Sequence, residues 1–365
     1  MAETTYLEAI RQALFEEMHR DQTVFCLGQD IGHFGGAFKV TRGLLETFGP
    51  SRVIDMPIAE SAIVGVAIGA ALRGLRPVAE MQFADFVTGG FSQLVNNAAT
   101  FHYRLGVSVP MVVRLPSGGG VGGGPFHSRN PEAWFTHAPG LKVVAPATPR
   151  DARRLLKAAI RDPDPVIFLE QKYLYRRLKE DLEQELEDAD YADYADGAEG
   201  SGFEERGDDA VRASRTRARA EGEEEDSDLL AFGRARVARR GEHVSIVTYA
   251  NGVGLSLDAA HVLGQEGIQV EVLDLRTLVP WDYEAVLKTV AKTGRLLVVQ
   301  EATRTTGFAS EVCAVVAELG FENLDAPIRR VTAPDTPTPS EQGLEAFVRP
   351  NCDRIVEALR WLLAY

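Results

Sequence analysis

Cysteine is scarce in this sequence, and its spacing fits neither metal nor disulfide chemistry. The chain of 365 residues has three cysteines, Cys26, Cys313 and Cys352, which lie far apart. This usage argues against a disulfide framework and against a zinc site, and it is typical of a reducing compartment. We therefore expect a cytoplasmic protein whose thiols stay reduced.

Long hydrophobic runs and a leader segment are also lacking. The longest apolar run, from Ala62 to Leu72, is too short to span a bilayer. The first residues, Met1 to Glu8, have no basic stretch followed by an apolar core, so no signal peptide is expected. The sequence therefore predicts no membrane association.

The acidic balance of the chain comes from one segment. The net charge is −14, yet residues 180–228 hold 20 of the 53 acidic residues and five of the 39 basic ones. The rest of the chain is close to neutral. A neutral fold offers no bulk attraction to nucleic acid or to an anionic membrane, so we expect neither as a partner.

Short apolar strands alternate with helical patterns in two separate regions. Residues 1–178 and 229–365 both show this alternation, which is typical of a parallel α/β sheet covered on both faces. Residues 179–228 between them are acidic and of low complexity, with too few apolar residues to offset the entropy of ordering. We predict an α/β protein with two doubly wound domains and a solvated, mostly disordered linker. A partner-binding role for this linker is the less favoured alternative.

The stretch from Met56 to Leu72 predicts a helix that starts after a turn. Pro57 disfavours helix in the residue before it, and Glu60 falls in the first helical turn. From Ala62 onward there is no polar face, so we expect a buried helix whose small residues let a backbone or a flat ligand come close. Glu60 is either a first-turn acid that complements the helix dipole or a desolvated acid that exchanges a proton.

A glycine-rich loop, Gly118 to Gly124, follows a predicted strand and leads to His127. It matches neither the P-loop pattern nor a dinucleotide-binding pattern that opens into a helix, so it is a poor candidate for a phosphate site. We expect a flexible wall that lets backbone approach a ligand and aims His127. His127 is then a site residue or a surface residue, and His137 is expected to have a structural role.

Gln82 to Phe86 come directly after another predicted strand, Pro77 to Met81. In an open α/β sheet, the carboxyl ends of the strands line the ligand crevice. Phe86 is either a core aromatic residue or a ring that stacks on a flat heterocycle. Asp85 is expected to cap the turn that follows.

Seven segments carry a resemblance to a known family: Met56–Glu60, Gly74–Phe86, Pro116–Ser128, Pro139–Val144, Asp164–Glu170, Glu271–Asp282 and Lys292–Arg295. Together they resemble the β subunit of the thiamine-diphosphate-dependent 2-oxoacid dehydrogenases, in particular the branched-chain and pyruvate decarboxylating components. The resemblance extends over nearly the whole chain, with the acidic segment as its main departure. It implies a pyrimidine-binding transketolase-like domain, residues 1–178, and a transketolase C-terminal-like domain, residues 229–365.

The resemblance implies roles for individual residues. Glu60 matches the acid that hydrogen-bonds the pyrimidine ring of thiamine diphosphate, and Phe86 matches the aromatic residue that stacks on this ring. His127 matches the histidine that positions and protonates during acyl transfer to the lipoyl group, and Gln82 is a further cofactor-binding candidate. Some relatives bind a potassium ion near the positions that match Met111, Ala159, Asp162 and Asp164.

The motif that this family uses for the diphosphate is missing. The sequence has no Gly-Asp-Gly motif with an asparagine downstream, since Asp196-Gly197 lies in the acidic segment and lacks that context. The resemblance therefore implies an α subunit that binds the diphosphate and Mg²⁺, in an α2β2 heterotetramer that works with a lipoyl acyltransferase core. We expect an enzyme subunit that is inactive by itself.

The implied activity is oxidative decarboxylation of a branched-chain 2-oxoacid or of pyruvate, with acyl transfer to lipoyl-lysine. Ala84-Asp-Phe86 and the glycine-rich loop favour the branched-chain type. Two alternatives stay open: a split transketolase or deoxyxylulose-phosphate synthase-like subunit, and a non-catalytic docking scaffold. Enzymes of the first kind handle phosphosugars and would need basic residues at the mouth of the site, where the loop has none and only Arg129 is close.

Overall fold

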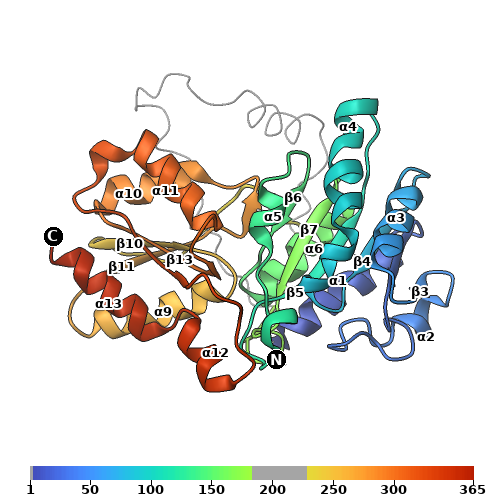
Figure 1. Cartoon of the computed structure of the whole chain (residues 1–365), viewed down its shortest axis with the longest axis horizontal. Coiled ribbons are helices and arrows are strands. Elements are labelled where there is room, and N and C mark those ends of the chain that lie inside the picture. Colours follow the sequence, from blue (N-terminus) through green and yellow to red (C-terminus); the bar gives the residue numbers. More distant parts are fainter. Residues whose placement is uncertain (1–2, 183–227) are drawn as a thin grey trace.

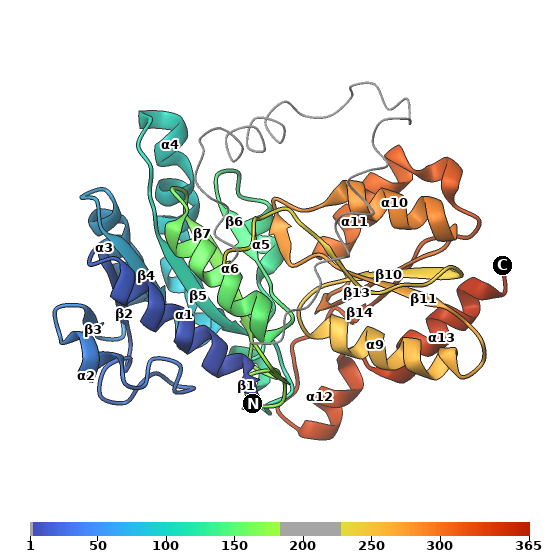
Figure 2. The same cartoon turned by 180° about the vertical axis from the view of Figure 1, so that it is seen from behind.

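The computed structural model describes residues 3–182 and 228–365, which form two α/β domains (Figure 1). The prediction of two doubly wound domains is confirmed, since each domain is built on a largely parallel sheet with helices on both faces (Figures 1 and 2). Most of the predicted acidic linker, residues 183–227, lies outside the described residues. At its described ends, β8 (Lys179–Glu180) pairs with β1 (Thr4–Thr5), and Asp228 forms ion pairs with Arg153 and Lys157.

The first domain has a seven-stranded sheet in the order β12-β6-β7-β5-β4-β2-β3. All neighbouring strands are parallel except β12, which pairs antiparallel with β6 at one edge. The central strands are buried along nearly their whole length because helices cover both faces. The strands are β2 (Val24–Gly28), β3 (Val53–Asp55), β4 (Arg76–Glu80), β5 (Val112–Ser117), β6 (Lys142–Val144), β7 (Val166–Gln171) and β12 (Thr277–Val279).

Helices α1 (Tyr6–Arg20) and α6 (Pro149–Arg161) cover one face of this sheet (Figure 2). Thr5 and Thr148 cap them, and each side-chain oxygen accepts an N–H of the first turn. The loops carry α2 (Leu44–Phe48) and the 3-10 helix η3 (Gly124–Phe126). The other face of the sheet carries α3 (Glu60–Ala71), the 3-10 helix η1 (Ala84–Gly90), the π-helix η2 (Gln93–Ala98), α4 (Ala99–Leu105) and α5 (Glu132–Thr136).

The second domain has a five-stranded sheet in the order β14-β13-β10-β11-β9, in which β9 is antiparallel to β11. Helices α9 and α13 pack on one face, and α10 and α11 pack on the other (Figure 1). The strands are β9 (Arg236–Arg239), β10 (Val244–Thr248), β11 (Val270–Asp274), β13 (Leu296–Thr303) and β14 (Arg329–Ala333). The helices are α9 (Asn251–Gly264), α10 (Tyr283–Thr293), α11 (Phe308–Leu319), η4 (Phe321–Asn323), α12 (Gln342–Val348) and α13 (Cys352–Leu363).

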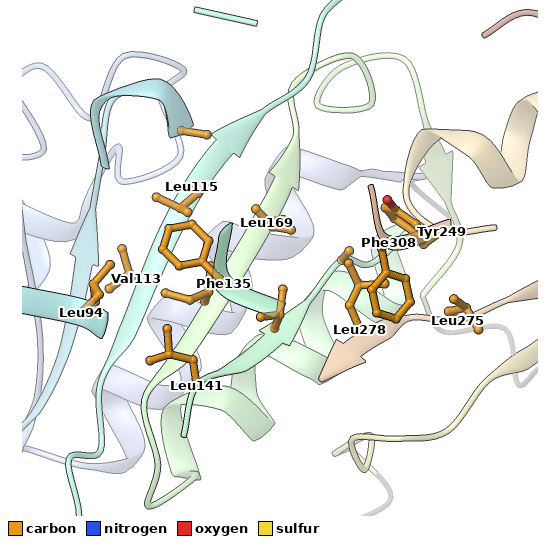
Figure 3. Close-up of a cluster of buried hydrophobic side chains, with 14 of the residues drawn as sticks. Leu94, Val113, Leu115, Phe135, Leu141, Leu169, Tyr249, Leu275, Leu278 and Phe308 are labelled. Carbon is orange, nitrogen blue, oxygen red and sulfur yellow. The ribbon is translucent and has the colours of Figure 1, made fainter. Parts of the chain in front are cut away.

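One hydrophobic cluster runs without a break through both domains (Figure 3). Phe135 and Leu169 belong to it on the side of the first sheet, and Tyr249 and Phe308 belong to it on the side of the second. Leu278 of β12 lies between the two groups and is fully buried. Because β12 follows β9, β10 and β11 of the second sheet in sequence but completes the first sheet, the two domains share part of their core.

Helix α3 is not buried on all sides, contrary to the prediction from its apolar sequence. Ile63, Val64 and Ala67 are buried against the sheet, whereas the side that carries Gly65 and Val66 is exposed. The described residues place nothing within 4 Å of a Cβ built on Gly65, so no described element covers that side. Neither α3 nor any other helix in the described ranges has both the length and the apolar content needed to cross a bilayer.

A buried ion cluster ties together three strands of the first sheet. Arg114 of β5 donates through Nε and Nη2 to Glu170 of β7, at 2.6 and 2.8 Å, and through Nη1 to Glu80 of β4. Tyr175 donates its hydroxyl to the same Glu170 carboxylate at 2.6 Å. Burial raises the pKa of Glu80, and the nearby guanidinium opposes this rise. The cluster therefore fixes the ends of the strands from which the candidate site projects.

Candidate active site

The predicted site residues gather where the strands of the first sheet reach their carboxyl ends. Glu60 begins α3 after β3, Gln82 and Phe86 follow β4, and His127 ends the loop after β5. In a parallel sheet these ends lie along one edge, which is where open α/β folds bind ligands. Residues from three separate segments of the sequence therefore meet on one side of the molecule.

Glu60 is the first residue of α3 and is half-buried. Its Oε1 accepts a hydrogen bond from Gln29 Nε2 at 3.2 Å, so a residue just after β2 orients the carboxylate. Gly89 lies directly against it, and a Cβ at this position would be 3.1 Å from Glu60 Cβ. Gln29 was not predicted from the sequence, because nothing in its local pattern points toward a residue 31 positions away.

His127 packs edge-on against two phenylalanine rings. Its ring centroid is 4.5 Å from that of Phe83 and 5.4 Å from that of Phe86, with interplanar angles of 81° and 78°. His127 Nδ1 donates to the carbonyl oxygen of Gly123 at 3.2 Å, since a carbonyl can only accept. In the neutral imidazole this leaves the lone pair on Nε2. Phe83 was not predicted, whereas Phe86 was.

Gln82 turns toward a different loop. Its Nε2 donates to Asp30 Oδ2 at 2.7 Å, and Asp30 lies in the loop after β2 with a positive φ of 56°. The structure thus places Gln82 near the same strand end as Gln29, the partner of Glu60. The contact joins the segment after β4 to the segment after β2.

Asp85 is buried and bonds to the segment after His127 instead of capping a turn, which corrects the expectation for this residue. Its Oδ2 accepts the backbone N–H of Arg129 at 3.3 Å, and burial raises its pKa. Lys172 is also buried, and its Nζ donates to Pro116 O at 3.3 Å and lies 5.7 Å from the ring centroid of Phe83. Burial lowers the pKa of Lys172 to about 8.

The glycine-rich loop is held by carboxylates of the second domain. The N–H of Gly119 donates to Glu301 Oε1 at 2.7 Å. The N–H groups of Gly120 and Gly122 donate to Oε1 and Oε2 of Glu345, at 2.9 and 3.0 Å. The prediction that this loop is flexible is therefore wrong, since three of its amides have fixed partners that lie more than 180 positions away in the chain.

A second polar link between the domains lies close to this loop. Tyr249, after β10, donates its hydroxyl to Glu132 Oε1 of α5 at 2.7 Å, and both side chains are buried. Burial raises the pKa of Glu132 to about 7, and the hydrogen bond from Tyr249 opposes this rise. His137, which was expected to have a structural role, is exposed where α5 ends.

The four residues assigned to a potassium ion lie at the opposite end of the strands from the predicted site, where β5 and β7 begin. Lys142 Nζ donates to both carboxylate oxygens of Asp162, at 2.7 and 2.8 Å, and lies 3.1 Å from Asp164 Oδ2. The Met111 carbonyl accepts the N–H of Val166, and the Asp162 carbonyl accepts from Arg76. Within the described ranges, no group of three or more His, Cys, Asp and Glu side chains is arranged to hold a metal ion.

Comparisons with known proteins match both domains. Residues 2–177 match the transketolase pyrimidine-binding domain, and residues 233–355 match the transketolase C-terminal domain. The chain is 42% identical to the 2-oxoisovalerate dehydrogenase subunit beta of Bacillus subtilis, and the match covers 100% of both chains. It is 38% identical to the pyruvate dehydrogenase E1 component subunit beta of Rickettsia felis, with 99% of this chain and 98% of that protein covered. It is 39% identical to the mitochondrial beta-2 subunit of rice pyruvate dehydrogenase E1, with 98% and 86% covered.

A solved structure described as a split gene transketolase, an inactive beta4 tetramer, has the same fold. The TM-score is 0.71, the alignment covers 100% of this chain and 99% of that one, and the sequences are 21% identical. At this identity the likeness concerns the fold alone. It agrees with the two-domain architecture described above.

Proposed function

The chain belongs to the family of β subunits of thiamine-dependent 2-oxoacid dehydrogenase E1 components, and we propose that it forms one half of the active site of such an enzyme. The proposed reaction is oxidative decarboxylation of a branched-chain 2-oxoacid, or of pyruvate, with transfer of the acyl group to a lipoyl-lysine. The observation that carries the proposal is the convergence of Glu60, Phe86 and His127 at one sheet edge, beside a side of helix α3 that the described residues leave open.

The residues at this edge fit the pyrimidine half of thiamine diphosphate. Glu60 has one oxygen bonded to Gln29, and its second oxygen is the acceptor that we assign to a ring nitrogen. Phe86 is half-buried and presents an apolar ring to a flat heterocycle, with Gln82 as a further contact. When bound, thiamine diphosphate supplies the nucleophile and the electron sink for loss of CO2, and the protein supplies orientation and proton transfer.

The residues of the chain then have separate tasks. Glu60 holds the proton that it shares with the pyrimidine ring, and Gln29 keeps the carboxylate in place for this exchange. His127 has Nδ1 bonded to a backbone carbonyl, which fixes the ring and directs Nε2 as the acid or base during acyl transfer. Phe83 and Phe86 limit the orientations of the imidazole by their edge contacts.

We assign the diphosphate and Mg²⁺ to an α subunit. The sequence has no Gly-Asp-Gly motif with a downstream asparagine, and the described part of the chain offers no cluster of acidic, histidine or cysteine side chains for a metal. The exposed apolar side of α3, next to Glu60, supplies a surface that a second chain can approach closely. We propose an α2β2 heterotetramer that delivers acyl groups to a lipoyl acyltransferase core.

The branched-chain type is the substrate class that we favour. It rests on the segment that ends at Phe86, on the glycine-rich loop and on the 42% identity with the 2-oxoisovalerate dehydrogenase subunit of Bacillus subtilis. Pyruvate is the alternative, because pyruvate dehydrogenase subunits are nearly as similar. Kinetics of the assembled enzyme with 2-oxoisovalerate, its branched homologues and pyruvate decide between them: the favoured class should have the highest kcat/KM.

We propose a cytoplasmic location, where the three thiols remain reduced. Burial raises the pKa of Cys26 to about 12, and burial also raises the pKa of Cys313 and Cys352, so the reactive thiolate form is disfavoured at each. Fractionation of the source cells, with an antibody against this chain, checks the location. Recovery in an organelle fraction, as the names of the mitochondrial relatives would suggest, contradicts it.

We propose that a potassium ion binds at the amino ends of β5 and β7. The carboxylates of Asp162 and Asp164 there are bonded to Lys142, so carbonyl oxygens are the ligands for a monovalent cation. The carbonyls of Met111 and Asp162 each accept a hydrogen bond and keep a second lone pair. Thermal unfolding in matched KCl and NaCl tests this. A higher midpoint in KCl supports the site, and an Asp164→Asn variant should reduce the difference; equal midpoints in the two salts contradict it.

Reconstitution with an α subunit tests the main proposal. The chain by itself should not decarboxylate 2-oxoacids in the presence of thiamine diphosphate and Mg²⁺, and the mixture should. Glu60→Gln should lower the rate of the mixture by about a hundredfold or more, since it removes a general acid–base. Glu46→Gln, which changes another first-turn acid on the short helix α2, is the matched control and should leave the rate unchanged.

Three outcomes would overturn the proposal. Decarboxylation by the chain alone would refute the shared site, and full activity of Glu60→Gln would leave Glu60 as a helix-dipole residue or the chain as a scaffold. Activity on phosphosugars without activity on 2-oxoacids would favour a split transketolase or deoxyxylulose-phosphate synthase-like subunit.

A further inference from the structure

The glycine-rich loop before His127 is held by two carboxylates of the second domain, Glu345 and Glu301, which we call the clasp. Glu345, which lies on α12 and is buried, accepts two amides of the loop with its two oxygens, Gly120 to Oε1 and Gly122 to Oε2. Glu301 at the end of β13 accepts a third, that of Gly119. A carboxylate that accepts backbone N–H groups forms hydrogen bonds that are shorter and stronger than neutral ones.

Glu301 is itself held in a fixed orientation by a network of donors. Arg349 donates to both of its oxygens, at 3.1 and 3.0 Å, and Gln171 Nε2 donates to its Oε2 at 2.8 Å. The guanidinium of Arg349 holds the pKa of Glu301 below its usual range against the opposing effect of burial, so this acid is ionised at neutral pH. The network contains residues of both domains, since Gln171 ends β7 of the first sheet.

The clasp reaches His127 through two residues. Gly122 is bonded to Glu345, and the next residue, Gly123, supplies the carbonyl that accepts from His127 Nδ1. On the far side, a Cβ at Gly124 would lie 2.2 Å from Ser340 Oγ, so the second domain also packs directly against the loop there. The backbone that orients the imidazole is therefore fixed on both sides by residues between 301 and 345.

We propose that Glu345 and Glu301 are positioning residues for His127, and that the second domain thereby takes part in the active site. This inference rests on the proposed function, because it is His127 of the proposed site that they orient. Without the clasp, a loop with this many glycines samples a wide range of backbone conformations, since glycine loses more freedom on ordering than any other residue. The Nε2 atom would then be correctly placed only part of the time.

The Glu345→Gln variant tests the contact directly. An amide side chain has one acceptor oxygen, so one of the two glycine N–H groups loses its partner and faces an NH2 donor. Hydrogen–deuterium exchange of the full-length chain should become about tenfold faster in the peptide that spans residues 116–127. This measurement needs neither the cofactor nor the α subunit, so its result stands whether or not the proposed function is correct.

Glu341→Gln is the matched control. Glu341 is the N-cap residue of α12, and its carboxylate also accepts two backbone N–H groups, but they are those of Gly343 and Leu344 in its own helix. If loosening of α12 were the cause, both variants would accelerate exchange in residues 116–127 equally. If the contact with the loop is the cause, Glu345→Gln alone should accelerate exchange in residues 116–127.

Kinetics of the enzyme reconstituted with an α subunit give the second readout. Glu345→Gln should lower acyl transfer to a lipoyl domain by about tenfold, because the acid–base group is misplaced, while decarboxylation followed with an artificial electron acceptor changes little. Glu301→Gln should act in the same direction.

The proposal is overturned if exchange in residues 116–127 is unchanged by Glu345→Gln, or if both half-reactions fall equally in Glu345→Gln and Glu341→Gln. If the wild-type mixture decarboxylates no 2-oxoacid, the proposed function fails, and the exchange result alone then decides the clasp.

Discussion

Tyr249 and Glu132 join the two domains through a hydrogen bond of 2.7 Å between two buried side chains. Tyr249 belongs to the core cluster that both domains share (Figure 3), and Glu132 begins the helix that follows the His127 loop. Burial raises the pKa of Glu132 to about 7, well above that of a glutamate in water. The domain boundary thus contains a carboxyl group that changes charge near neutral pH.

This carboxyl group should make stability depend on pH. The folded pKa of about 7 exceeds the unfolded value of about 4.3, so the folded state binds more protons between these limits and the free energy of unfolding falls as pH rises through them. The loss is on the order of 3 kcal/mol and is complete above about pH 7. Glu132→Gln keeps an acceptor for Tyr249 and cannot ionise. It should be more stable than the wild type at about pH 8, and the difference should shrink toward about pH 5. Parallel pH slopes of the thermal midpoint for the two proteins would contradict this.

Removing Arg114 should destabilise the chain strongly. Arg114→Met leaves two carboxylates, Glu80 and Glu170, buried without their cation, and breaking a buried ion pair in this way costs about 3–5 kcal/mol. Arg104→Met, at an exposed position in α4, should change stability by less than about 0.5 kcal/mol. Urea unfolding of both full-length variants at neutral pH measures the difference. Equal midpoints would show that the ion cluster does not fix the strand ends.

A larger side chain at position 65 should increase the stability of the chain but weaken its binding to the α subunit. No described residue lies within 4 Å of a Cβ at Gly65, so Gly65→Leu should stabilise the chain by about 0.5–1 kcal/mol through its higher helix propensity. The same change should weaken binding of the α subunit at least about tenfold, because a close approach to α3 is blocked. Gly254, in α9 of the second domain, also has open space around it, so Gly254→Leu should increase stability without weakening α-subunit binding. Calorimetry and titration with the α subunit measure both quantities; unchanged affinity in Gly65→Leu would place the α subunit elsewhere.

Phe83 should be needed for acyl transfer although it was not predicted as a site residue. Phe83→Leu keeps an apolar side chain but removes the ring edge contact with His127, and such contacts are worth about 0.5–1.5 kcal/mol. We expect acyl transfer to a lipoyl domain to slow by about threefold to tenfold, with little change in thiamine binding. Phe91→Leu, which removes an aromatic contact with Trp134 away from His127, is the control. An equal loss in both variants would mean that the effect comes from general packing.

Much of the fold and part of the site could be predicted from local sequence patterns. Apolar strands alternating with helices specify a covered parallel sheet, and in such a sheet the residues after β3, β4 and β5 must meet at one edge. Glu60, Phe86 and His127 were therefore found from their positions after strands together with the family resemblance. Their roles remain predictions that the proposed variants test.

The partners of these residues could not be predicted, because their contacts are distant in sequence. Gly120 and Glu345 are 225 positions apart, and no periodicity or motif connects a glycine-rich loop with a short helix near the end of the chain. The prediction that helix α3 is buried on all sides was wrong for a different reason. Its apolar sequence indicates that every side is suited to burial, but it does not say whether the same chain or another one covers each side.

The edge strand β12 has a consequence for how the protein is made. Thr277 and Val279 pair with Val144 and Val143, so the seventh strand of the first sheet leaves the ribosome only after three strands of the second sheet have been synthesised. Until then the first half of the newborn polypeptide presents β6 as an open edge, which is a template for mispairing with other chains. Expression of residues 1–178 as a fragment would leave that edge open permanently, and self-association of the fragment is the expected outcome.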